Sequence, residues 1–207
     1  GMVVVAAVDA STRQLDGAQH RWTFLEQVTD PGALGFRSVA SGAGEWMVAD
    51  HAEATGARAL FNAAGSPGEP PAITVVDRLA ARDLRAMTRC KVSPGREEQA
   101  CGLVFRYRDR GYYVAHVDAL QGAVRLSAVV DGVEQPLEIA PAKLGPSVWQ
   151  ELAVQARGEH ITVEWNGRKV IDVRDTAHPS PGAVGLWGPA EGEAFFDELA
   201  VHAALAR

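Results

Sequence analysis

The amino-acid sequence is poor in the features that define several large classes of protein. It has only two cysteines, Cys90 and Cys101, and no C-x-x-C pair, so cysteines alone cannot provide a four-ligand zinc site. No apolar run reaches the roughly 18 residues that a membrane-spanning helix needs. The net charge is -6, which gives no overall basic field for nucleic acids or anionic membranes. We therefore expect a protein that binds neither nucleic acid nor membranes.

Local catalytic motifs are missing as well. The sequence has no P-loop, no dinucleotide-binding glycine fingerprint, no G-x-S-x-G and no H-E-x-x-H. Any catalytic group would have to be assembled from residues that are distant in the sequence.

The first residues are apolar but too few to span a bilayer. Residues 2–8 have no basic residue before them and are followed by Asp9. This pattern favours a β-strand over a shortened signal peptide. If Met2 is the natural start, no export signal is visible and the protein is expected in the cytoplasm; otherwise it is expected to be exported.

The composition that remains is that of one globular β-domain. Of the 207 residues, 47% are hydrophobic and 22% are charged, which is ordinary for a chain with a real core. Turn signals recur at short intervals between alternating or β-branched segments, and no segment keeps a helical period. This spacing predicts an all-β sandwich or barrel over residues 1–207 as a single domain.

Two hairpins can be registered from their turns. The Asn-Gly pair at 166–167 and the Asp-Gly pair at 131–132 are type I′ signals, because both residues of each pair tolerate positive φ. A slip of one residue would move every side chain to the other face, so apolar residues fix the parity. The predicted pairs are Val163 with Val170 and Leu126 with Leu137.

Neighbouring turns extend the second hairpin into a meander. A three-residue loop at 109–111 pairs Phe105 with Ala115, and symmetry about residues 93–100 places Cys90 opposite Cys101. We therefore predict a five-stranded antiparallel sheet from residue 84 to residue 140. The second sheet is expected from segments near 58–62, 72–77, 148–156, 160–166, 168–174 and 194–202.

The two cysteines have two interpretations in this arrangement. In an exported protein they would form a cross-strand disulfide, whereas in the cytosol they would be two small buried residues.

The face of the predicted sheet that points away from the core is polar. Its side chains are the ones that a solvated strand face or a ligand-binding face would present. They are Arg85, Met87, Arg89, Arg106, Arg108, Tyr112, His116, Asp118, Arg125, Ser127, Glu134 and Glu138.

Several motifs occur in an order that resembles a known family. Residues 102–109, GLVFRYRD, followed by Tyr112-Tyr113, are similar to the GlvFRyqD…YY signature of bacterial concanavalin A-like domains. Further matches are WMVAD at 46–50, WQELAV at 149–154, ITVEWNG at 161–167, GAVGLW at 182–187 and FDELAV at 196–201. The resemblance covers about residues 22–202 and is shared with LamG-type modules and with the family called 3-keto-disaccharide hydrolase. It implies a two-sheet antiparallel jelly-roll sandwich of the concanavalin A-like lectin and glucanase type.

This fold hosts lectins, hydrolases and interaction modules, so three functions follow from the resemblance. The leading one is a carbohydrate- or ligand-binding lectin-like module that binds a saccharide on the polar face of one sheet. The alternatives are a glycoside hydrolase or 3-keto-disaccharide-type hydrolase, and a non-catalytic structural or interaction domain. Glucanases of this fold have an E-x-D-x-(x)-E strand, which is missing here, and the adjacent Asp197 and Glu198 are expected on opposite faces.

The candidate site residues come from the polar face and from strand ends. Arg106, His116 and Asp118 share the predicted face and could hydrogen-bond sugar hydroxyls, and Trp187, near a strand end, could stack on a sugar ring. The alternative is a solvated face with charges paired across strands, and a core tryptophan. Asp197 matches a late aspartate that helps hold structural Ca²⁺ in similar sandwiches, so calcium is the one cofactor considered. The sequence predicts no oligomeric state.

Overall fold

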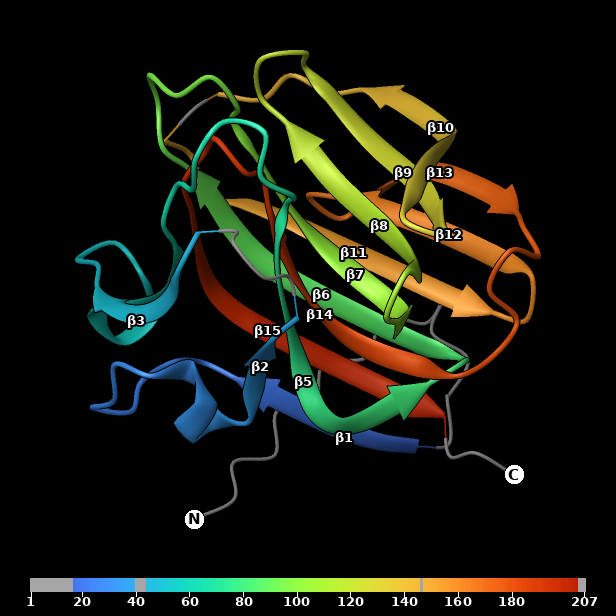
Figure 1. Ribbon diagram of the computed structural model, residues 1–207, viewed down its shortest axis with the longest axis horizontal. Coiled ribbons are helices and arrows are strands. Elements are labelled where there is room, and N and C mark those ends of the chain that lie inside the picture. The colour runs from blue at the N-terminus through green and yellow to red at the C-terminus, as the bar shows by residue number, and fades with distance from the viewer. Residues whose placement is uncertain (1–16, 40–43, 146, 205–207) are drawn as a thin grey trace.

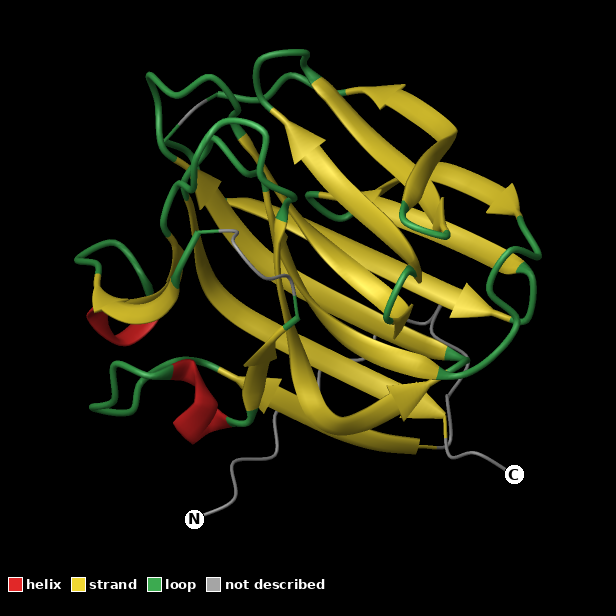
Figure 2. Cartoon of the chain, in the orientation of Figure 1, coloured by secondary structure: helices red, strands yellow, loops and turns green. Residues whose placement is uncertain are grey.

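The protein consists of two antiparallel β-sheets that pack face to face, as Figures 1 and 2 show. The computed structural model describes residues 17–39, 44–145 and 147–204. The strand predicted at residues 2–8 lies outside this range. Within it, none of the helical segments has the length and hydrophobicity of a membrane span. The predicted all-β jelly-roll sandwich is confirmed.

The larger sheet has eight strands. Its main path runs β13, β12, β11, β6, β15, β4 and β3, and β1 pairs with β15 beside β4. The strands are β1 (Gly17–Trp22), β3 (Trp46–Asp50), β4 (Arg58–Asn62), β6 (Leu84–Val92), β11 (Gln150–Arg157), β12 (His160–Trp165), β13 (Arg168–Arg174) and β15 (Ala194–Ala204).

The smaller sheet has seven strands in the order β10, β9, β8, β7, β14, β5 and β2. They are β2 (Phe36–Ser38), β5 (Ala72–Ala81), β7 (Ala100–Arg108), β8 (Gly111–Asp118), β9 (Ala123–Val130), β10 (Val133–Pro141) and β14 (Gly182–Gly188). Two short 3₁₀ segments, η1 (Pro31–Leu34) and η2 (Thr55–Ala57), lie in the connections beside the edge strands.

Alternation along the strands builds the core between the sheets. Every second residue of β6, from Leu84 to Val92, is buried, and the residues between them are partly exposed. The same period places Tyr113, Ala115 and Val117 of β8 in the core. Because successive side chains of a strand point to opposite faces, each sheet has one core face and one outer face.

The arrangement of β6 and β7 corrects the predicted five-stranded meander. β6 lies in the eight-stranded sheet between β11 and β15, whereas β7 lies in the seven-stranded sheet between β8 and β14. The connection between them crosses from one sheet to the other instead of closing a hairpin. The alternation of apolar and polar residues could not reveal this. The apolar side chains of both strands point into the core whether the strands form a hairpin in one sheet or lie in opposite sheets. Segment 72–77 was likewise expected in the other sheet, and it belongs to β5 of the seven-stranded sheet.

The two cysteines form a disulfide that links the two sheets through the core. The Cα atoms of Cys90 and Cys101 are 6.3 Å apart, and both side chains are fully buried. The bond therefore joins strands that face one another rather than neighbouring strands of one sheet. A link that closes a loop of this length is expected to stabilise the fold by about 3 kcal/mol.

Bulges change three predicted pairings, although the first residue of each pair keeps the core side predicted for it. The extra residue of a bulge shifts the partners beyond it, and the turn residues give no sign of it. Phe105, Leu126 and Val163 are all buried as predicted. Their observed partners are Tyr113 instead of Ala115, Glu138 instead of Leu137, and Ile171 instead of Val170.

Candidate functional site

Arg106 was predicted on the outer face, and the structure places it in the interior. It lies in the bulge of β7 with a φ of 50°, and its side chain is 1% exposed. Its guanidinium donates to the carbonyl oxygens of Arg82 at 2.8 Å, His178 at 2.9 Å and Gly158 at 2.7 Å. These carbonyls belong to three different turns at one end of the sandwich. Arg106 is therefore a structural clamp and its predicted position on the outer face is wrong, while its contact with a ligand stays a prediction.

His116 and Trp187 meet on the outer face of the seven-stranded sheet. Trp187 of β14 and His116 of β8 are both in register with Gly102 of β7, which lies between them. Because Gly102 has no side chain, the two rings can stack across it, with centroids 4.7 Å apart and planes 19° apart. Burial lowers the pKa of His116 to about 4, so this imidazole is neutral at pH 7.

The stacked His116 and Trp187 rings pack beside a layer of aliphatic side chains on the same outer face. Trp187 packs with a second apolar cluster, separate from the main core, and both rings of the pair are 8% exposed. The other members of the cluster are Ile73, Val75, Ala100, Val104, Val114 and Val129. Trp187 therefore offers no open ring face, and the ligand-binding roles assigned to His116, Asp118 and Trp187 stay predictions.

Asp197 is fully buried and lies against the outer face of the eight-stranded sheet. Its carboxylate accepts hydrogen bonds from the Thr55 backbone N–H at 2.8 Å, the Thr55 hydroxyl at 3.0 Å and Arg89 Nη1 at 2.7 Å. A bulge between Phe196 and Glu198 breaks the alternation, so Glu198 pairs in register with the same Arg89 and the expectation of opposite faces is wrong.

The hydrogen bonds of Asp197 fix the loop that contains η2. A guanidinium and two donors occupy the carboxylate, which is unlike a set of oxygen ligands around Ca²⁺. Among the described residues, no group of three or more His, Cys, Asp or Glu side chains could hold a metal ion. The calcium site at Asp197 stays a prediction.

Two openings flank the short edge strand β2. The first, which we call the face pocket, lies on the outer face of the seven-stranded sheet and measures about 320 Å³. Its wall includes Tyr107, whose ring packs on Tyr112 with centroids 5.1 Å apart. The residues that line the face pocket are Arg37, Val39, Tyr107, Arg108, Asp109 and Ala183.

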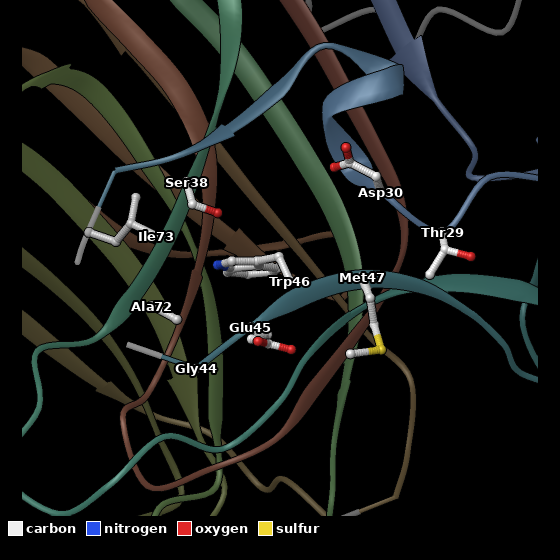
Figure 3. Close-up of a pocket in the computed structure, with 9 residues that line it drawn as sticks. All are labelled: Thr29, Asp30, Ser38, Gly44, Glu45, Trp46, Met47, Ala72 and Ile73. Atoms are coloured by element: carbon white, nitrogen blue, oxygen red, sulfur yellow. The ribbon is translucent and has the colours of Figure 1, made fainter. Parts of the chain in front are cut away.

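The second opening, which we call the edge pocket, is larger, at about 550 Å³, and is shown in Figure 3. It lies where β2 and β3, which end their respective sheets, approach each other on the open side of the sandwich. The residues that line it are Thr29, Asp30, Ser38, Gly44, Glu45, Trp46, Met47, Ala72 and Ile73.

Hydrogen-bonding groups without protein partners meet in the edge pocket. The Trp46 indole packs on Phe196 with centroids 5.6 Å apart, and its buried Nε1 has no hydrogen-bond partner in the part of the chain that the structure describes. In Figure 3 this nitrogen is on the side of Ser38 and Ile73. A buried donor left unpaired is costly, so such a group in a pocket wall is a sign of a ligand or water site.

Two acidic side chains complete the edge pocket. Oδ1 of Asp30 accepts the Gly32 N–H at 2.8 Å and caps η1, which fixes the direction of the carboxylate. The Glu45 carboxylate has no hydrogen bond or ion pair within the described part of the chain. No Lys or Arg is among the described residues that line this pocket, so their polar groups are mainly hydrogen-bond acceptors.

Sequence reasoning missed both pockets. The sequence marks Trp46 only as part of the WMVAD motif and gives Glu45 beside it no role. The signals that could have found them are modest: a Glu-Trp pair at the start of an edge strand, and a Tyr at the end of β7. The pockets form only because β2 and β3 end two different sheets, which no local pattern shows.

The fold and these pockets place the protein among concanavalin A-like sandwich domains. The sequence profile of the family described as "Beta xylosidase C-terminal Concanavalin A-like domain" matches residues 68–181, more than half of the 207-residue chain. The protein belongs to this family.

Solved structures with the same fold come from proteins of different function. The carbohydrate-binding module CBM66 from Bacillus subtilis is 20% identical with a TM-score of 0.69, over 86% of this chain and 98% of that one. The β-glucanase of Bacillus licheniformis is 11% identical with a TM-score of 0.63, over 91% and 99% of the two chains. A GH16 protein from the mixed-linkage glucan locus of Bacteroides ovatus, solved with a G4G4G3G product, is 7% identical with a TM-score of 0.64, over 88% and 99%. At these identities the likeness establishes the fold. No curated protein sequence matches the chain.

Proposed function

We propose that this domain is a carbohydrate-binding module that holds a sugar in the edge pocket. The observation that carries the proposal is that Trp46, whose buried N–H is unpaired, Glu45 and Ser38 line one opening of about 550 Å³. Ligand pockets of about 300–1,000 Å³ with a few convergent polar groups are typical of small-molecule sites. Sugar hydroxyls both donate to carboxylates and accept from N–H groups, so they match this set.

The relatives support a saccharide as the ligand. The family is named for β-xylosidases, one structural neighbour is a carbohydrate-binding module, and another was solved with a glucan product. These names suggest two probes, xylotetraose and the mixed-linkage tetrasaccharide G4G4G3G. The pocket chemistry adds that the bound unit should be neutral, because two carboxylates and no cation line the pocket.

Calorimetric titration of the purified domain with the two tetrasaccharides tests the proposal. Glu45→Gln keeps the side-chain shape but weakens the acceptor, and should lower the affinity of whichever sugar binds by about tenfold. Trp46→Phe removes the N–H while keeping a ring against Phe196, and should act in the same direction. Glu134→Gln is the matched control, because Glu134 is exposed on β10 outside both pockets and should bind like the wild type. Equal affinities in Glu45→Gln and the wild type would contradict the proposal.

Glycoside hydrolysis is a second candidate, favoured by the presence of two carboxylic acids, Asp30 and Glu45, in one pocket. A glycosidase needs such a pair, one as acid and the other as base or nucleophile. The same tetrasaccharides, incubated with the protein and analysed for shorter products, test this activity. Products that form with the wild type but not with Asp30→Asn would favour hydrolysis; intact sugar after long incubation would leave binding alone.

The inter-sheet disulfide supports an oxidising location. Disulfides persist in exported proteins and are rare in the cytosol, so we infer that this protein functions outside the cytoplasm. Labelling of thiols in protein taken from its native host should detect none before reduction and two after it.

A further inference from the structure

We propose that the face pocket is a second sugar subsite, so that the ligand is an oligosaccharide that passes over β2 rather than a single sugar unit. This inference rests on the proposed function of the edge pocket and names the size of its ligand.

The two pockets are neighbours on one short strand. Ser38 lines the edge pocket, and the residues on either side of it, Arg37 and Val39, line the face pocket. A strand rises about 3.3 Å per residue, so the two pockets lie within about one sugar length of each other along the chain. Because Ser38 of β2 faces one opening while Arg37 and Val39 on either side of it face the other, this stretch of chain separates the two pockets.

One apolar surface runs from one pocket to the other. Ile73 lines the edge pocket and also belongs to the outer-face cluster on which Val39 and Tyr107 pack. The Val39 N–H donates to the Ile73 carbonyl at 3.0 Å, which holds the two side by side. A sugar chain presents C–H faces as well as hydroxyls, so a continuous apolar floor between two polar pockets suits it.

The polar groups of the two pockets differ in their share of hydrogen-bond donors. Two carboxylates, Asp30 and Glu45, line the edge pocket, whereas two arginines, Tyr107 and one carboxylate, Asp109, line the face pocket. Arg37 gives only its Nε to Asp77, at 2.9 Å, and its side chain is largely exposed. The Arg108 side chain is exposed and has no hydrogen bond or ion pair among the described residues. A pocket rich in donors next to a pocket rich in acceptors can hold successive sugar units through different hydrogen bonds.

The experiment compares chain lengths. Xylose, xylobiose and xylotetraose are titrated into the wild type, and glucose and G4G4G3G are titrated in parallel. Wild-type affinity should rise by about tenfold or more from the monosaccharide to the tetrasaccharide of the series that binds. Arg108→Ala and Tyr107→Phe should each lower tetrasaccharide affinity about fivefold or more and leave monosaccharide affinity unchanged. Arg168→Ala, an exposed arginine at the end of β13, is the matched control and should have no effect.

The outcomes separate this inference from the function on which it rests. If Glu45→Gln weakens binding while Arg108→Ala and Tyr107→Phe do not, the edge pocket is a sugar site and the second subsite is refuted. Equal affinity of the wild type for mono- and tetrasaccharide would refute it as well. If neither series binds at all, both proposals fail together.

Discussion

On the eight-stranded sheet, the side chains that point away from the core are held by ion pairs. Arg89 pairs with Asp197 at 2.7 Å and Arg85 with Glu164 at 2.7 Å, and Lys91 pairs with Glu53. On the seven-stranded sheet, the corresponding face is an aliphatic layer under stacked rings, with a neutral histidine among them. One outer face thus uses charges to fasten a loop, while the other is apolar and opens into pockets.

The difference shows where a ligand would find unpaired groups. Charges on the eight-stranded sheet satisfy each other, so little is left for a ligand. Groups that lack a side-chain partner among the described residues lie at the open edge where β2 and β3 approach each other: Trp46 Nε1 and the Glu45 carboxylate in the edge pocket, and Arg108 in the face pocket. Unsatisfied groups, rather than the most polar face, therefore mark the candidate site.

The largest expected loss of stability comes from removing a buried carboxylate on the outer face of the eight-stranded sheet. Asp197→Ala leaves Arg89 and the Thr55 N–H without their acceptor, and should lower the free energy of unfolding by about 3 kcal/mol. Urea denaturation of the wild type and the variant measures this difference. Asp197→Asn keeps an acceptor oxygen for Thr55 and should lose less. A loss below about 1 kcal/mol in Asp197→Ala would show that the loop does not depend on this carboxylate.

The next largest loss of stability is expected when the His116–Trp187 ring stack on the outer face of the seven-stranded sheet is disturbed. A Cβ on Gly102 would lie 2.3 Å from the Ala115 carbonyl oxygen and 2.7 Å from the His116 Cβ. Gly102→Ala must therefore push β7 and β8 apart and should cost about 2–3 kcal/mol in the same denaturation assay. Gly145→Ala is the control, because its Cβ would make only an ordinary contact with Val148 at 3.4 Å. Equal stability of the two variants would mean that the stack across Gly102 is not tight.

A smaller effect is the pH dependence of stability that His116 contributes on the apolar outer face. In the folded protein the pKa of His116 is about 4, whereas in the unfolded chain it is about 6.5. Between these values only the unfolded state binds the proton, so stability falls as the pH drops from 6.5 towards 4 and is constant below that. From pH 8 to pH 5 this histidine should account for a loss of about 2 kcal/mol.

His116→Phe keeps a ring against Trp187 but cannot take up the proton. From pH 8 to pH 5, the unfolding free energy of this variant should fall by about 2 kcal/mol less than that of the wild type. Parallel curves for the two proteins would show that His116 titrates normally.

The smallest expected effect is on a partly exposed ion pair of the charged face. The Arg85 and Glu164 side chains are 29% and 28% exposed, so solvent screens their interaction. Glu164→Gln should cost less than about 1 kcal/mol, and the cost should shrink further in 1 M salt, where the Debye length is about 3 Å. A salt-independent loss as large as that of Asp197→Ala would remove the distinction between buried and exposed pairs on this face.

Much of the fold could be predicted because turns and alternation are local. The Asp-Gly and Asn-Gly turns and the burial of Phe105, Leu126 and Val163 follow from residues close in the sequence. The bulges could not be predicted, because one extra residue in a strand leaves no sign in its turn. Arg106 shows the consequence: its bulge turned a predicted surface charge into a buried clamp on three carbonyls.

The candidate site was predictable only in part. His116, Asp118 and Trp187 do lie on one outer face, as parity requires, but burial of the His116–Trp187 stack depends on Gly102 of a third strand. The edge pocket joins residues 29–30, 38, 44–47 and 72–73, which only the meeting of two sheet edges brings together.

By itself, the sequence determined the fold class, the core face of the hairpin strands where no bulge intervenes, and the positions of two tight turns. These are consequences of backbone geometry over a few residues. Which sheet each strand joined was decided by the tertiary structure, since either choice buries the same apolar face. The disulfide between sheets, the clamp at Arg106 and the two pockets beside β2 arose in the same way. Each depends on contacts between segments far apart in the chain, and no local pattern records which distant segment will be the partner.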